Sequence, residues 1–191
     1  MTSNPSRNDA YLVDGATSLR AFREDDAAHL AAWWDDARVT EFLEMGARPT
    51  RKKDLDSFLS AAVQSDDSVC FAICDAGTGK IIGTCGLYLI SWIARRAQFN
   101  ILIGDPEAWD KGHGSRAASL TLAYGFNTLN LNSVHLGVNT ENKRAMKSYE
   151  NAGYTKEGVR RSFIFRNGRY YDVAMYSVLK DEFAAMRSAM K

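Results

Sequence analysis

A loop with two glycines joins an apolar, strand-like run to a long helical pattern, and this junction most constrains what the chain can fold into. The loop spans residues 109–115, the apolar run 99–103 and the helical pattern 116–129. Gly112 and Gly114 precede the expected helix, where glycine lets successive backbone N–H groups turn inward and the helix dipole adds partial positive charge. The junction therefore predicts a strand, an anion-binding loop and a helix, in that order.

Other groups in the loop agree with a bound phosphate. Lys111 brings a cation, and Ser115 offers a hydroxyl at the position expected to cap the helix. Two phosphate motifs are excluded, because the sequence contains no G-x-x-x-x-G-K-[ST] and because Ser-Arg-Ala follows Gly114, which breaks G-x-G-x-x-G. Nucleotide hydrolysis and dinucleotide redox chemistry are therefore poorly supported. Since short glycine pairs are also common in ordinary turns, the rest of the chain has to decide.

Length, charge and cysteine usage describe an ordinary globular protein. The 191 residues predict one domain over residues 1–191, with a polar, mobile segment at 1–15. A formal net charge of +1 argues against nucleic acid as the partner. No apolar run approaches the roughly 18 residues that span a bilayer, and no signal-peptide core is present, so we expect a cytoplasmic protein without a membrane partner. The three cysteines predict buried free thiols rather than disulfides or a metal site.

The pattern of apolar residues predicts alternating strands and helices in an α/β arrangement. The expected strands lie at residues 18–22, 69–74, 81–89, 97–103 and 134–138, followed by a hairpin of 163–165 and 170–178. The expected helices run from Asp25 or Asp26 to 35–36, from 39 to 45, from 50 to about 62, from 116 to 129, from 143 to 151 and from 182 to 190. Asn142 is the expected N-cap of the fifth helix and Gly153 its stop. No internal repeat or composition break marks a second domain.

Four segments in the right order resemble the GNAT acyltransferases, in the branch that contains ribosomal-protein N-terminal, spermidine and amino-sugar acetyltransferases. They are residues 19–26, the loop 109–115, residues 142–154 and residues 167–173. The loop is similar to the family pattern Gln/Arg-x-x-Gly-x-Gly/Ala, except that Trp109 stands where Gln or Arg is usual. The third segment matches N-x-x-A-x-x-x-Y-x-x-x-G-[FY], the family's second cofactor motif.

This resemblance implies the GNAT fold, a mixed, mostly antiparallel twisted sheet with helices on both faces. It implies acetyl-CoA as co-substrate, no metal, and direct transfer of the acetyl group within a ternary complex to a primary amine of a small molecule or a protein N-terminus. Tyr149 is the expected proton donor to the leaving thiolate. The residues expected to bind the cofactor are Leu102, Ile103, Lys111, Gly112, His113, Gly114, Ser115, Asn142, Ala145 and Tyr149.

The general base and the acceptor stay open in the sequence. His135 is one candidate for the base, Glu41 and Glu44 are others, and a water relay is a further option, whereas His29 and His113 look peripheral. Because side chains at Asn142 and Tyr149 are about two helical turns apart, both lie on one face of their helix.

Three residues are expected to bind the acceptor: Glu44, Trp92 and Gln98. Spermidine acetyltransferases tend to carry a carboxylate where Gln98 stands, which weakens a polyamine acceptor, although Glu44 matches an acidic position of that subgroup. A ribosomal-protein N-terminus and a nucleotide-linked amino sugar stay open, as does a homo-oligomeric state. Trp33, Trp34 and Trp92 could line the acceptor cleft by stacking on the substrate. The alternative interpretation is that at least two of them fill the core. The alternative function is a non-catalytic acyl-CoA sensor, which the Trp109 departure favours.

Overall fold

The computed structural model describes residues 9–43, 46 and 48–189, and its elements alternate as expected of an α/β chain. The strands are β1 (Leu12–Asp14), β2 (Thr17–Arg20), β3 (Val69–Asp75), β4 (Ile81–Ser91), β5 (Arg96–Ile103), β6 (Ser133–Asn139), β7 (Thr155–Arg166) and β8 (Arg169–Leu179). The helices are α1 (Asp26–Asp35), α2 (Lys52–Gln64), α3 (His113–Asn127), α4 (Lys143–Asn151) and α5 (Lys180–Ala189), with a short 3₁₀ turn at Pro106–Ala108.

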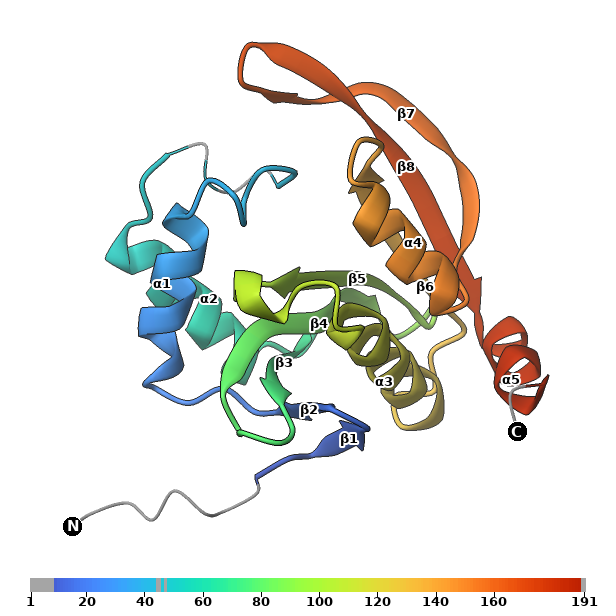
Figure 1. Cartoon of the computed structure of the whole chain (residues 1–191). Helices are drawn as coiled ribbons and strands as arrows, with labels where there is room; N and C mark the ends of the chain where they lie inside the picture. Colours follow the sequence, from blue (N-terminus) through green and yellow to red (C-terminus); the bar gives the residue numbers. More distant parts are fainter. Residues whose placement is uncertain (1–8, 44–45, 47, 190–191) are drawn as a thin grey trace.

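The described strands form one sheet in the order β1-β2-β3-β4-β5-β6-β8-β7 (Figure 1). Neighbouring strands are antiparallel except β5 and β6, which are parallel. The expectation of a mixed, mostly antiparallel sheet is therefore confirmed. The β7–β8 hairpin extends beyond the rest of the sheet as a long arm (Figure 1).

Helices cover both faces of the sheet. Successive side chains of a strand point to opposite sides, so alternate apolar residues of one strand pack against the helices of each face. Phe71 and Ile73 of β3 belong to the apolar cluster that contains residues of α3, α4 and α5. Ala72 and Cys74 belong to the cluster that contains residues of α1 and α2. We call these two sides the α3 face and the α1 face. The predicted placement of helices on both faces is confirmed.

Local chemistry explains several element ends. The Asn142 side chain accepts a hydrogen bond from the Ala145 N–H at 3.0 Å, which caps α4 as predicted. Gly153 follows α4 with φ 98°, a left-handed conformation that suits glycine. Asn167 and Gly168 both have positive φ, 51° and 79°, as a tight hairpin turn between antiparallel strands requires.

Two expectations about the first half of the chain are wrong. Residues 12–14 form β1, which pairs with β2, so the expected mobile segment does not extend to Gly15; residues 1–8 lie outside the described part. Tyr11 stacks near Phe71, which explains how this polar segment is held. Residues 39–43 form turns instead of a helix, because the Val39 and Thr40 N–H groups both donate to the Asp36 carbonyl and the chain folds back.

The predicted cap of α1 is confirmed in its position but not in its side-chain hydrogen bond. Asp25 occupies the N-cap position without a side-chain hydrogen bond. Asp26 instead accepts two hydrogen bonds of 2.8 Å from the Arg20 guanidinium, and both side chains are buried.

The three cysteines are buried free thiols, as expected. Among the described residues, no helix combines the length and the apolar character needed to cross a membrane.

Candidate functional site

The two parallel strands at the centre of the sheet separate part-way along their length. β5 and β6 pair at three positions, the last being Gln98 with His135. β5 then continues to Ile103 and β6 to Asn139 without further pairing between them. A cavity of about 1060 Å³ is lined by residues of both separated segments, together with the start of α3 and one side of α4.

The separation leaves one edge of β5 open to this cavity. A Cβ on Gly83 of β4 would lie 2.2 Å from the Leu102 carbonyl, so the backbone groups of Leu102 point toward β4. Because backbone groups of alternate residues point to opposite edges of a strand, those of Ile101 and Ile103 point toward the cavity. The Ile103 carbonyl accepts the Trp109 indole N–H at 2.8 Å. The backbone N–H groups of Ile101 and Ile103 are thus donors at the cavity edge.

The start of α3 supplies a second set of donors. Gly112 is the N-cap, with φ 80° and no side chain to cap the helix, and the first helical bond is Arg116 N–H to Gly112 carbonyl at 3.2 Å. The N–H groups of the three residues between them therefore have no acceptor within the helix. Gly112, His113 and Gly114 line the cavity. An uncapped helix start of this kind favours a phosphate.

Two of the predicted loop residues lie elsewhere. Ser115 is inside the first turn of α3 instead of capping it, and its hydroxyl donates to the Ser148 carbonyl at 3.4 Å. The cap position falls on Gly112 because the helix begins three residues earlier than expected. Lys111 is exposed, and it does not line the cavity. The cation expected from the loop is therefore not in the cavity.

The His113 side chain holds the loop against the sheet. Its Nδ1 lies 2.9 Å from the Thr17 hydroxyl of β2, and its Nε2 lies 4.0 Å from the Asp75 carboxylate. Burial lowers the pKa of His113, with Asp75 acting in the opposite direction. His113 is 3% exposed, so it contributes its main chain to the cavity while its imidazole anchors the loop.

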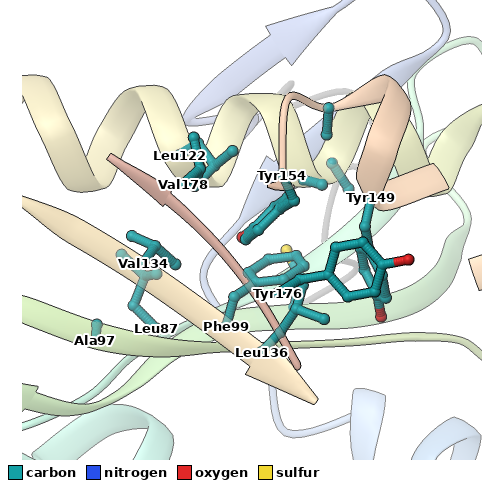
Figure 2. Close-up of a cluster of buried hydrophobic side chains, with 14 of the residues drawn as sticks. Leu87, Ala97, Phe99, Leu122, Val134, Leu136, Tyr149, Tyr154, Tyr176 and Val178 are labelled. Carbon is teal, nitrogen blue, oxygen red and sulfur yellow. The ribbon is translucent and has the colours of Figure 1, made fainter. Parts of the chain in front are cut away.

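α4 presents three predicted residues to the cavity: Asn142, Ala145 and Tyr149. The Asn142 side-chain oxygen is engaged in the helix cap, which leaves its amide nitrogen for a ligand. Tyr149 packs edge-on against Phe99 and is 9% exposed. Figure 2 shows the Tyr149 hydroxyl directed away from Leu122. Burial raises the pKa of Tyr149, so the phenol keeps its proton at neutral pH.

Polar side chains form a row on the α1 face where the strands separate. Tyr88, Gln98 and His135 are cross-strand neighbours of β4, β5 and β6, and all three line the cavity. Burial and then the charge of Arg96 lower the pKa of His135. An imidazole in this state is neutral near pH 7 and can accept a proton. The structure thus places the predicted acceptor residue Gln98 beside the candidate base His135.

The other residues predicted as base or acceptor contacts differ in whether they line the cavity. Glu41 lines the cavity, and Glu44 lies outside the described residues. Trp92 does not line it: the side chain lies in the turn after β4, where its indole N–H donates to the Asp66 carbonyl at 3.0 Å. Its predicted acceptor role is therefore not supported by position.

The other tryptophans belong to the core of the α1 face, as the alternative interpretation held, although Trp34 also reaches the cavity. Sequence reasoning missed Tyr88, Arg144 and Arg160, all of which line the cavity. Arg144 carried a signal, since it lies inside the second motif. The described residues contain no group of three or more His, Cys, Asp or Glu side chains that could hold a metal ion.

Comparisons with known proteins agree with this architecture. Residues 17–155 match the acetyltransferase (GNAT) domain family. An uncharacterized N-acetyltransferase, p20 of Bacillus licheniformis, is 31% identical over 169 residues, which cover 87% of this chain and 94% of that protein. The spermidine N(1)-acetyltransferase of Escherichia coli is 36% identical over 107 residues, covering 56% of this chain and 57% of the enzyme.

A solved structure extends the similarity to the fold. The spermidine N-acetyltransferase of Vibrio cholerae, crystallised in complex with CoA and spermine, has a TM-score of 0.79 and 28% identity, and the match covers 90% of this chain and 99% of that chain. The predicted GNAT fold is therefore confirmed. The chain belongs to the GNAT acetyltransferase family and is an acyltransferase that uses acetyl-CoA as its co-substrate.

Proposed function

We propose that this chain transfers the acetyl group of acetyl-CoA to a primary amine by direct attack within a ternary complex. One observation carries the proposal: a single cavity brings together the uncapped start of α3, the open edge of β5 and the Tyr149 phenol. The α3 start suits the coenzyme diphosphate, and the β5 edge suits the pantetheine arm and the thioester. A coenzyme laid along these elements would place its sulfur near Tyr149.

The cavity also crosses the sheet, which suits two substrates that meet from opposite sides. Ile101 and Ile103 contribute to the α3 face, where α3 and α4 lie, whereas Gln98 and His135 face the α1 side. We assign the coenzyme to the α3 side and the amine to the α1 side. The acetyl group would then be presented at the point where β5 and β6 separate.

The reaction makes three chemical demands: stabilising the oxyanion, removing a proton from the amine and stabilising the leaving thiolate. The cavity offers a group for each. An N–H of Ile101 or Ile103 can donate to the carbonyl oxygen as it gains negative charge. His135, neutral because its pKa is lowered, can accept a proton from the attacking amine. An alkylammonium with a pKa near 10.4 must lose its proton before attack, which near pH 7 costs roughly 4 kcal/mol.

Tyr149 can stabilise the leaving thiolate. Because a thiol has a pKa near 8.5 and burial raises the pKa of Tyr149 above its ordinary value near 10, complete proton transfer to sulfur is uphill by about 2 kcal/mol or more. A hydrogen bond from the phenol to the developing thiolate needs no such transfer. We therefore assign Tyr149 the role of hydrogen-bond donor first, with protonation completed as the thiol departs.

The acceptor side of the cavity favours an amine that is not a polycation. Arg160 lines the cavity, and its charge acts on His135. Gln98 offers an amide, hydrogen-bonded to the Asn100 side chain at 3.2 Å, where a carboxylate would complement a second ammonium group. Three acids of the described residues line the cavity. Glu141 pairs with Arg169, and Asp110 belongs to the loop before α3, on the side assigned to the coenzyme, which leaves Glu41 for the acceptor side. An amino sugar or a peptide N-terminus fits this lining better than spermidine.

The test is release of free thiol from acetyl-CoA in the presence of single acceptors. The panel contains spermidine, a free amino sugar, a nucleotide-linked amino sugar and a peptide with a free N-terminus, and product masses confirm a gain of one acetyl group. We expect thiol release with at least one acceptor and a rate for spermidine below the best of the others. If CoA binds but no acceptor releases thiol, the chain acts as a sensor and the proposal fails.

A further inference from the structure

Trp109 stands where the family pattern has Gln or Arg, and the structure shows what this tryptophan holds. Its indole N–H donates to the Ile103 carbonyl at 2.8 Å, which fixes the ring beside the cavity. The guanidinium carbon of Arg144 lies 4.2 Å from the centre of this ring. A cation over an indole face is a favourable arrangement, and a guanidinium can stack flat on it.

Arg144 has no competing protein acceptor. Among the described residues, its guanidinium makes no hydrogen bond or ion pair, and it packs on the Trp109 ring. Lys143 beside it is different, since its ammonium group donates to the Thr140 carbonyl at 2.6 Å. Arg144 therefore lines the cavity with all of its hydrogen-bond donors available to a ligand.

The position of Arg144 is unfavourable without an anion nearby. It lies in the first turn of α4 next to Lys143, and that turn contains no acidic residue. Cations near a helix N-terminus oppose the helix dipole. The start of α3, with uncapped N–H groups, faces the same cavity. An anion bound between the two helix starts would be attracted by all of these groups together.

We propose that Arg144, held flat on Trp109, binds the diphosphate of acetyl-CoA and supplies the cation that position 109 itself lacks. The assignment rests on the proposed function, because it places the coenzyme in this cavity. We assign Arg144 to the diphosphate and not to the 3′-phosphate because Trp109 belongs to the same loop as Gly112 and Gly114. This loop leads to the α3 start, which we assign to the diphosphate. Trp109 is a positioning residue, and Arg144 makes the contact with a planar, two-donor geometry suited to phosphate oxygens.

The experiment compares three ligands by calorimetry: CoA, dephospho-CoA, which lacks the 3′-phosphate, and pantetheine, which lacks the 3′-phosphate, the diphosphate and the adenosine. Arg144→Gln should weaken CoA and dephospho-CoA equally, by about 10- to 100-fold, and leave pantetheine unchanged. Arg144→Lys should recover part of the loss, because it restores charge without the planar fork. Trp109→Leu should weaken the same two ligands by about 3-fold or more. Lys147→Gln, which removes an exposed charge of α4 outside the cavity lining, is the matched control and should change none of them.

Two results would overturn the inference. Unchanged affinity of Arg144→Gln for CoA would remove Arg144 from the site, and a loss for CoA but not for dephospho-CoA would move its contact to the 3′-phosphate. Gly114→Val distinguishes this failure from failure of the proposed function. If Gly114→Val abolishes CoA binding and Arg144→Gln does not weaken it, the coenzyme site stands and the Arg144 assignment alone is wrong. Melting temperatures equal to that of the unmodified protein verify that the exposed-site variants are folded.

Discussion

Replacing Gly114 by valine should destroy coenzyme binding while leaving the fold intact. A Cβ at this position would meet Ser148 Oγ at 3.8 Å and Ile103 Cγ1 at 4.0 Å, which are ordinary contact distances. Gly114 lies in the first turn of α3, where valine is a better helix former than glycine. The added methyl groups project into the cavity at the uncapped helix start. We therefore expect the melting temperature to be unchanged or slightly raised.

The loss of affinity follows from the donors that the side chain covers. A hydrogen bond to a charged group contributes about 1.5–3 kcal/mol, so covering two N–H groups costs about 3–6 kcal/mol. This corresponds to a rise in Kd of about 10²- to 10⁴-fold, measured by calorimetry with CoA. Gly158→Val is the matched control, because a Cβ there meets nothing within 4 Å and β7 residue Gly158 lies outside the cavity lining. A folded Gly114→Val protein that binds CoA as tightly as the unmodified chain would refute the assignment of the α3 start to the diphosphate.

Three further predictions test the catalytic groups and the core. Tyr149→Phe should lower kcat at least about tenfold with little change in CoA affinity, because the lost hydroxyl serves the leaving thiolate. Tyr154→Phe, which removes a buried hydroxyl without a hydrogen-bond partner, should leave kcat unchanged. His135→Gln should lower kcat by about 100-fold or more. In the unmodified protein, kcat should fall at low pH with a midpoint below pH about 6.5, since burial lowers the pKa of His135 and only its neutral ring accepts a proton. Arg20→Met should cost about 3–5 kcal/mol in urea unfolding, because it leaves Asp26 buried without its partner.

The Asp26 pair also predicts a pH dependence of stability. Burial alone would raise the pKa of Asp26, but the hydrogen bonds from the Arg20 guanidinium and the Arg23 N–H, together with the charges of both arginines, outweigh it and lower the pKa. The folded state therefore binds the proton less readily than the unfolded chain, and the pair contributes its full stability above pH about 4. That contribution should be lost as the pH falls from about 4 through the lowered pKa. A free energy of unfolding that does not change with pH in this range would contradict the role of the Arg20–Asp26 pair. A pH profile of kcat that His135→Gln leaves unaltered would contradict the role of His135 as base.

Local chemistry allowed much of the secondary structure to be predicted. The capping amide of Asn142, the stop at Gly153 and the Asn167–Gly168 turn depend on residues within a few positions of each other. α4 was therefore predicted with its observed limits, and the hairpin with its turn. The error at residues 39–43 has the opposite cause, since helical spacing there competes with a turn that folds back on Asp36.

The sequence by itself determined the glycine loop at the start of α3, the face shared by Asn142 and Tyr149, and the family, because each depends on short motifs of residues close together in the chain. Only the tertiary structure decided that Gln98 lies beside His135, that Trp92 lies outside the cavity and that Arg144 rests on Trp109. These relations join segments that are distant in the sequence: Gln98 meets His135 because β5 and β6 pair there, Trp92 is hydrogen-bonded to the Asp66 carbonyl, and Arg144 of α4 packs on the loop before α3. Periodicity and propensity describe how a segment folds on itself. Strand pairing and packing decide which segments meet.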